Sequence, residues 1–318
     1  MEDRGPARCN RRRPGIHSRA EEPIDRARDR AGRRASAPPP PAAETGAAEG
    51  LGTALWLALF AVLFVALLVR DYALGQTEIG LLHVGPLTLA PFGPLVSLGV
   101  LFGIHLMHGW AVRFGLDWDR VFAAVGWMLV IGFVGSHLLD VALYNPRDFF
   151  DPRVVLDFRS EYSSFGGFVC GGLAAYVAFQ RGGVPLLRGM ECTLYGFIGG
   201  WLFGRLACFS VHDHPGLPTT FFLGVAIDGV KRHDLGFYEL LYTIVLFAVV
   251  LVTTRRRRYD GYVAAVAATS YAPVRFALDF LRVRDATYAG LTPAQWACFP
   301  LLALGLYFVA RGRRPEAR

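Results

Sequence analysis

The sequence predicts an all-α polytopic membrane protein with about eight transmembrane helices and a small extracytoplasmic head loop. Hydrophobic residues make up 53% of the 318 residues and gather in long blocks, as is typical of membrane-spanning chains rather than soluble domains. Each block approaches the ~20 residues that a helix needs to cross the hydrocarbon core. The eight blocks cover residues 51–69, 89–112, 121–143, 165–180, 192–209, 237–253, 261–281 and 293–310.

Residues 1–50 differ in composition from everything that follows. They are rich in Arg, Pro, Ala and Glu and contain almost no large apolar side chains. Such a segment cannot bury enough apolar surface to offset the entropy lost on ordering, so we expect a disordered cytoplasmic tail. A secretory signal peptide is the rival interpretation. It is disfavoured because the polar stretch is too long and too acidic.

The distribution of arginine predicts which loops face the cytoplasm. With the tail inside, the basic linkers also fall inside, as the positive-inside rule requires. The net charge of +7 therefore indicates orientation and not nucleic-acid binding. The inner segments are 113–120, 180–188, 255–258 and 311–314. The expected outer loops are 71–88, 144–164, 210–236 and 283–291, of which 210–236 is the head loop.

One arginine lies deep in an apolar block and precedes a polar, Pro/Gly-marked loop. Arg205 is followed by the loop that begins near Ser210, and an arginine in hydrocarbon costs about 2.5–3.5 kcal/mol on insertion scales. Snorkelling or pairing with an acid is one explanation. Binding a lipid phosphate is the other, because guanidinium matches phosphate geometry. Arg275, at similar depth in another block, can complete a two-arginine clamp, although Asp279 can neutralise it.

Histidine and cysteine give weaker signals. The loop His212-Asp213-His214 contains residue types that commonly bind metal ions. No further His/Cys cluster follows it and His233 is distant in sequence, so we expect no metal site. The five cysteines show no CxxC spacing, and we expect no disulfide framework. Cys208 is most simply a small apolar filler. The intramembrane pairs His105/His108 and His137/Asp140 favour interhelical hydrogen bonding.

Several motifs, taken in order, point to one family. They are His83-Val84-Gly85-Pro86-Leu87, Tyr144-Asn145, Phe165-Gly166-Gly167, Gly204-Arg205-Leu206-Ala207-Cys208-Phe209 with Asp213 and Gly216, Arg232-His233, Tyr238-Glu239-Leu240, and Tyr271 with Arg275, Asp279, Phe280 and Arg282. By order, spacing and loop side, residues 83–312 resemble the prolipoprotein diacylglyceryl transferases. In that comparison, residues 51–69 form an additional N-terminal helix before a seven-helix core.

The resemblance implies an enzyme of lipoprotein biosynthesis. It would move the diacylglyceryl group of phosphatidylglycerol to the lipobox cysteine thiol of a prolipoprotein, releasing glycerol phosphate. The implied catalytic residues are Arg205, Arg275 and Asp213. The implied substrate-binding residues are Gly204, Cys208, Gly216, His233, Tyr238, Glu239, Tyr271 and Asp279. The implied partners are phosphatidylglycerol, the prolipoprotein signal peptide and membrane lipids, with no metal, cofactor or nucleic acid. A monomer in the bacterial inner membrane is expected, with both termini cytoplasmic and the site facing the outer leaflet.

Some positions depart from the family pattern. Phe165 stands where the family has the histidine proposed as a base, and Cys208 replaces an asparagine. His212, His214 or His233 can replace the base. These departures leave two alternatives open: a non-catalytic paralogue that binds phospholipid or a lipoprotein precursor, and a lipid transferase with a different acceptor.

Overall fold

The computed structural model describes residues 42–77, 82–84, 87–144, 147, 149–157, 164–256, 258–283 and 287–313. The chain divides into two units, Met1–Ala48 and Glu49–Arg318. Most of the predicted N-terminal tail lies outside the described residues. Its last part is helical, because the first described helix begins at Ala42. Alanine and glutamate there are strong helix formers, which explains why the helix starts before residue 50.

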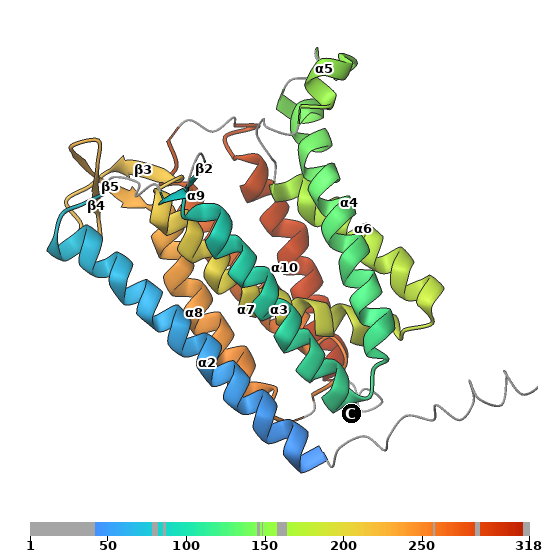
Figure 1. Cartoon of the computed structure of the whole chain (residues 1–318). Helices are drawn as coiled ribbons and strands as arrows, with labels where there is room; N and C mark the ends of the chain where they lie inside the picture. Colours follow the sequence, from blue (N-terminus) through green and yellow to red (C-terminus); the bar gives the residue numbers. More distant parts are fainter. Residues whose placement is uncertain are drawn as a thin grey trace, which may run out of the picture. The chain divides into compact units, whose positions relative to one another are not determined.

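The described part of the chain is dominated by helices (Figure 1). They are α2 (Ala42–Leu68), the π-helix η1 (Val69–Ala73), α3 (Phe92–Phe114), α4 (Trp118–Tyr144), α5 (Pro152–Val155), α6 (Ser164–Gly182), α7 (Leu186–Val211), α8 (Leu235–Thr253), α9 (Tyr262–Asp279) and α10 (Pro293–Gly312). The all-α polytopic class is confirmed. Each predicted apolar block coincides with one long helix.

Among the described residues, six helices are long and apolar enough to cross a membrane by length and composition. These are α2 with η1, α3, α4, α7, α8 and α10. The glycine-rich α6 and the more polar α9 fall outside this set. The total of eight spanning helices therefore stays a prediction.

Glycines set the distance between α3 and α7, which lie side by side in Figure 1. A Cβ added to Gly200 would lie 2.5 Å from the carbonyl oxygen of Gly99, and one added to Gly196 would lie 2.5 Å from that of Gly103. Small residues permit such close backbone approach where lipid supplies no hydrophobic driving force. The contact fixes α7 against α3 just before Arg205.

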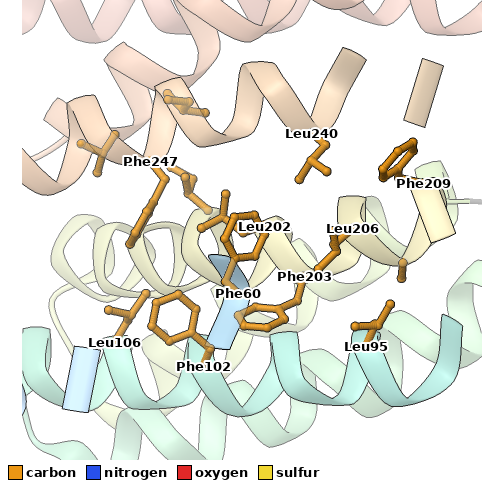
Figure 2. Packing of buried hydrophobic residues seen from close by; sticks show 14 of the residues in the cluster. Phe60, Leu95, Phe102, Leu106, Leu202, Phe203, Leu206, Phe209, Leu240 and Phe247 are labelled. Carbon is orange, nitrogen blue, oxygen red and sulfur yellow. The ribbon is translucent and has the colours of Figure 1, made fainter. Parts of the chain in front are cut away.

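Aromatic side chains fill the space between α2, α3, α7 and α8 (Figure 2). The ring of Phe60 on α2 meets Phe203 on α7 edge-on at 5.5 Å between centroids. Phe203 also meets Phe102 on α3 edge-on at 5.8 Å, and such pairs contribute about 0.5–1.5 kcal/mol beyond burial. From Glu49 onward, α2 is therefore part of the main core.

The predicted head loop contains a small antiparallel sheet. Its strands β3 (Pro215–Pro218), β4 (Val225–Ile227) and β5 (Val230–Asp234) lie in the order β3-β5-β4. Asp228 and Gly229 join β4 to β5 with φ values of 50° and 74°. An Asp-Gly pair with positive φ is the preferred two-residue hairpin turn. A second hairpin pairs β1 (Leu82–Val84) with β2 (Leu87–Leu89).

Candidate functional site

Arg205 is a buried cation within the apolar helix α7. It lies near the end of α7 and is only 8% exposed. The guanidinium lies over the ring of Trp201, one turn earlier, at 4.6 Å from the centroid, and an aromatic face stabilises a desolvated cation. Its Nε atom is buried and has no hydrogen-bond partner among the described residues. A buried donor without an acceptor is costly, so this atom is suited to an incoming anion.

Glu239 on α8 holds two arginines from two other helices. One carboxylate oxygen, Oε2, pairs with Nη2 of Arg205, and Oε1 accepts from Nη1 of Arg275 at 3.2 Å. The Tyr271 hydroxyl donates to Oε2 at 3.4 Å. Glu239 is 2% exposed, so little solvent screens these interactions. The predicted pair of arginines is therefore brought together, with a carboxylate between them.

Arg275 is also held from its own helix. Its Nη2 lies 2.9 Å from Oδ1 of Asp279, one turn further along α9. Asp279 in turn accepts from the Thr292 hydroxyl, which is the N-cap of α10, and it lies 3.6 Å from Nε of Arg282. Asp279 therefore pairs with Arg275, which is one of the alternatives that the sequence left open. In these contacts Arg205, Arg275 and Arg282 share two carboxylates, Glu239 and Asp279.

A second polar cluster joins the end of α7 to η1 and α8. His212 donates from Nδ1 to Oδ2 of Asp234 at 2.6 Å. Its Nε2 accepts from Nη2 of Arg70 at 3.2 Å, because a guanidinium can only donate. Arg70 also donates to the carbonyl oxygen of Ser210 at 2.9 Å and pairs with Asp71. Asp234 additionally caps α8 through Phe237 N.

This cluster bears on one of the three candidate bases and adds residues that sequence reasoning missed. His212 is buried and both of its ring nitrogens are hydrogen-bonded, which favours a structural role for it. Arg70, Asp71 and Asp234 were not predicted as functional positions. The available signal was an Arg-Asp pair directly after an apolar block, which is a costly placement unless the two charges are partnered.

Cys208, Asp213 and His214 converge where α7 ends. One ligand atom from each lies within 4.8 Å of the other two. His212 adopts the left-handed conformation as C-cap of α7, with φ 48°, and this turn folds the loop back over the last helical turn. Burial raises the pKa of the Asp213 carboxyl above its usual range, opposed by the His214 ring.

The remaining predicted residues are divided between the head sheet, the start of α8 and α7. His233 Nδ1 and the Tyr238 hydroxyl are 2.8 Å apart. Gly216 pairs with Arg282 across an isolated bridge, and a Cβ at Gly216 would lie 2.8 Å from the Leu281 carbonyl oxygen. Gly204 has ordinary contact with Trp201 at 3.5 Å, which gives no steric reason for glycine. The side chains of His83, Tyr144 and Phe165 lie outside the described residues.

The intramembrane histidines do not join this site. His105 lies 3.2 Å from the Thr53 hydroxyl, which confirms interhelical hydrogen bonding between α3 and α2. His137 donates to the carbonyl oxygen of Val155 at 3.1 Å. Glu191 lies near the opposite end of α7, about 20 Å from Arg205 at 1.5 Å per residue. Its carboxylate accepts from Val263 N at the start of α9 at 2.6 Å.

Known proteins match the chain over its membrane region. The family model described as prolipoprotein diacylglyceryl transferase matches residues 80–311. A relative from Cereibacter sphaeroides (strain ATCC 17025), named phosphatidylglycerol–prolipoprotein diacylglyceryl transferase, is 29% identical over 238 residues, or 64% of this chain and 82% of the relative. The Nitratidesulfovibrio vulgaris protein of that name is 29% identical over 247 residues, which are 72% of this chain and 92% of the relative. A Streptomyces coelicolor protein with that name and the number 2 is 27% identical over 241 residues, or 68% and 74%.

Proposed function

Because the chain belongs to the prolipoprotein diacylglyceryl transferase family, we propose that it transfers the diacylglyceryl group of phosphatidylglycerol to the lipobox cysteine of a prolipoprotein. The acceptor thiol loses its proton to solvent, and its sulfur forms a bond to the glycerol carbon that carries the phosphate. The carbon–oxygen bond to that phosphate breaks, and the electron pair leaves with glycerol phosphate. The acceptor is a prolipoprotein signal peptide, and the membrane supplies the donor lipid.

The observation that carries this proposal is the arrangement of Arg205, Glu239 and Arg275. Two guanidiniums from α7 and α9 are oriented by one carboxylate from α8. A phosphate leaving group gains negative charge in the transition state, and preorganised donors that face that charge lower the barrier. The unpartnered Nε of Arg205 offers one such donor. Glu239 is a positioning residue that keeps both cations in place before the lipid arrives.

The other candidate residues are assigned supporting roles. Tyr271 and Asp279 orient Glu239 and Arg275 through the contacts above. Tyr238 and His233 pair at the edge of the head, and Gly216 brings β3 against the segment after α9. A Cβ at Gly204 would make ordinary van der Waals contact with the ring of Trp201, over which the Arg205 guanidinium lies. Asp213 and Cys208 lie on the loop side of Arg205, where the acceptor peptide would approach.

We further propose that the protein is a monomer of the bacterial inner membrane, with both termini cytoplasmic. The arginine-bearing linkers 113–120, 180–188 and 255–258 support this orientation. In this orientation the end of α7 that carries Arg205, and the head sheet beyond it, face the outer leaflet. The uncleaved signal peptide of a prolipoprotein would meet the site from that side.

The test is complementation of a bacterial strain depleted of its own transferase, combined with mass spectrometry of an accumulated prolipoprotein. The expected result is a diacylglyceryl adduct on the lipobox cysteine and restored growth. An unmodified cysteine, from protein shown to be inserted, would refute the transferase proposal in favour of a lipid-binding paralogue. An adduct on a different acceptor would refute the assignment of the lipobox cysteine.

A further inference from the structure

Three side chains that commonly bind transition metals meet beside Arg205. Cys208 supplies a sulfur from the last turn of α7, and Asp213 and His214 supply an oxygen and a ring nitrogen from the loop that follows. All three candidate atoms lie within 4.8 Å of one another. In a tetrahedral zinc site with bonds of 2.0–2.3 Å, ligand atoms lie about 3.3–3.7 Å apart. A closure of about 1 Å therefore brings the three atoms to binding distance.

The surroundings are suited to a dication. A thiolate and a carboxylate together neutralise the two charges of Zn²⁺, and the ring of His214 adds a neutral ligand. His214 Nδ1 donates to the carbonyl oxygen of Asp213 at 2.9 Å. A backbone carbonyl that holds one ring proton leaves the other nitrogen with its lone pair, as in many metal-binding histidines. Arg205 lies near, and Glu239, which Arg205 shares with Arg275, offsets part of its charge.

The group is also accessible from one side. The side chains of Asp213 and His214 are 30% and 31% exposed, respectively. The Sγ atom of Cys208 faces Nη1 of Arg205 at 3.9 Å. A metal held here would have three protein ligands and an open position next to the arginine. Three ligands with an open position are typical of catalytic rather than structural zinc.

We propose that Cys208, Asp213 and His214 bind one Zn²⁺ ion, whose open position takes the thiolate of the acceptor cysteine. This inference rests on the proposed function, because it assigns the group that activates the acceptor. Coordination to zinc deprotonates a thiol, and the released proton passes to solvent. The thiolate sulfur then attacks the glycerol carbon, and the electron pair of the broken carbon–oxygen bond leaves on the phosphate beside Arg205.

The inference replaces the expectation of a metal-free site and gives Cys208 a role. Sequence reasoning searched for ligands after the His212-Asp213-His214 loop, whereas the third ligand precedes it in the helix. It also explains how activity can survive with Phe165 at the position of the family histidine. The metal would supply the thiolate that a general base supplies elsewhere.

The first experiment measures metal content in the purified full-length protein after exposure to zinc and removal of loosely bound ions. We expect about one zinc per chain, and on cobalt substitution a thiolate-to-cobalt charge-transfer band. Cys208→Ser should abolish the band, and Asp213→Asn and His214→Gln should each weaken zinc binding. Cys170→Ser is the matched control, because Cys170 is also free and half-buried. It should leave both readouts unchanged.

The second experiment adds a short peptide with one cysteine to the cobalt protein. The charge-transfer band should intensify with the cysteine peptide and not with its serine counterpart. Neither readout depends on turnover, so a failure here is distinct from a failure of complementation. Protein without stoichiometric zinc, or zinc content unchanged by Cys208→Ser, would overturn the site. A cobalt spectrum that does not respond to the peptide thiol would overturn its role.

Discussion

Replacing Glu239 by glutamine is expected to destabilise the protein by about 3 kcal/mol. The substitution keeps the size of the side chain but leaves Arg205 and Arg275 without their shared carboxylate. At the 3.2 Å separation of the Arg275 pair and an effective dielectric constant of about 20, the Coulomb energy is about 5 kcal/mol. Retained hydrogen bonds reduce this loss, and broken buried pairs typically cost about 3–5 kcal/mol.

The assay is thermal unfolding of the full chain in lipid nanodiscs. A loss of about 3 kcal/mol corresponds to a fall in Tm of roughly 4–5 °C for a chain of 318 residues. Phosphatidylglycerol should reduce the fall more than phosphatidylcholine, because its headgroup has a net negative charge that offsets the two guanidiniums left without a carboxylate, whereas the choline group neutralises the phosphate of phosphatidylcholine. Binding to the native state raises stability by mass action.

Glu191→Gln is the matched control. Glu191 is also a buried carboxylate, but it accepts from a backbone amide. Its replacement should lower the Tm by an amount that does not depend on the lipid headgroup. An unchanged Tm in Glu239→Gln would refute the ion-pair argument. An equal fall in both lipids would refute binding of an anionic headgroup beside the two guanidiniums.

Three further sets of substitutions test the arginine pair, the packing of α7 on α3 and the cluster around His212. Arg205→Ala and Arg275→Ala should each reduce lipid transfer by at least about 100-fold with insertion retained; near-normal activity in either would count against the clamp. Gly200→Leu should lower the free energy of unfolding by more than about 3 kcal/mol, because its Cβ would lie 2.5 Å from a carbonyl oxygen on α3. Arg70→Met should lower the free energy of unfolding by about 3 kcal/mol, because it removes the arginine that pairs with the buried Asp71 carboxylate. An unchanged Tm would show that the cluster does not stabilise the protein.

The apolar helices and Arg205 were recognisable because they depend on properties of single segments. A span is recognisable from sequence because the bilayer imposes a length and excludes charge over that length. Arg205 was recognisable for the same reason, as a charge inside an apolar block. The Asp228-Gly229 turn also carried a signal, although the head sheet was not predicted from it.

The partners of those residues were not predictable in the same way. Arg205, Glu239 and Arg275 belong to three helices and meet only when α7, α8 and α9 pack. Sequence spacing along one helix says nothing about which face a second helix presents. Arg70 and His212 are likewise brought together from distant segments, so nothing in the sequence indicated that the His212 ring is held by an arginine.

The sequence by itself determined that this chain crosses a membrane and carries Arg205 deep in an apolar block, because hydrophobic length and the cost of buried charge are properties of a segment alone. Only the tertiary structure decided that one carboxylate from α8 holds both Arg205 and Arg275. It also decided that the left-handed cap at His212 turns Asp213 and His214 back toward Cys208. Both arrangements depend on directions in space, which are fixed by packing and by backbone dihedrals rather than by residue type.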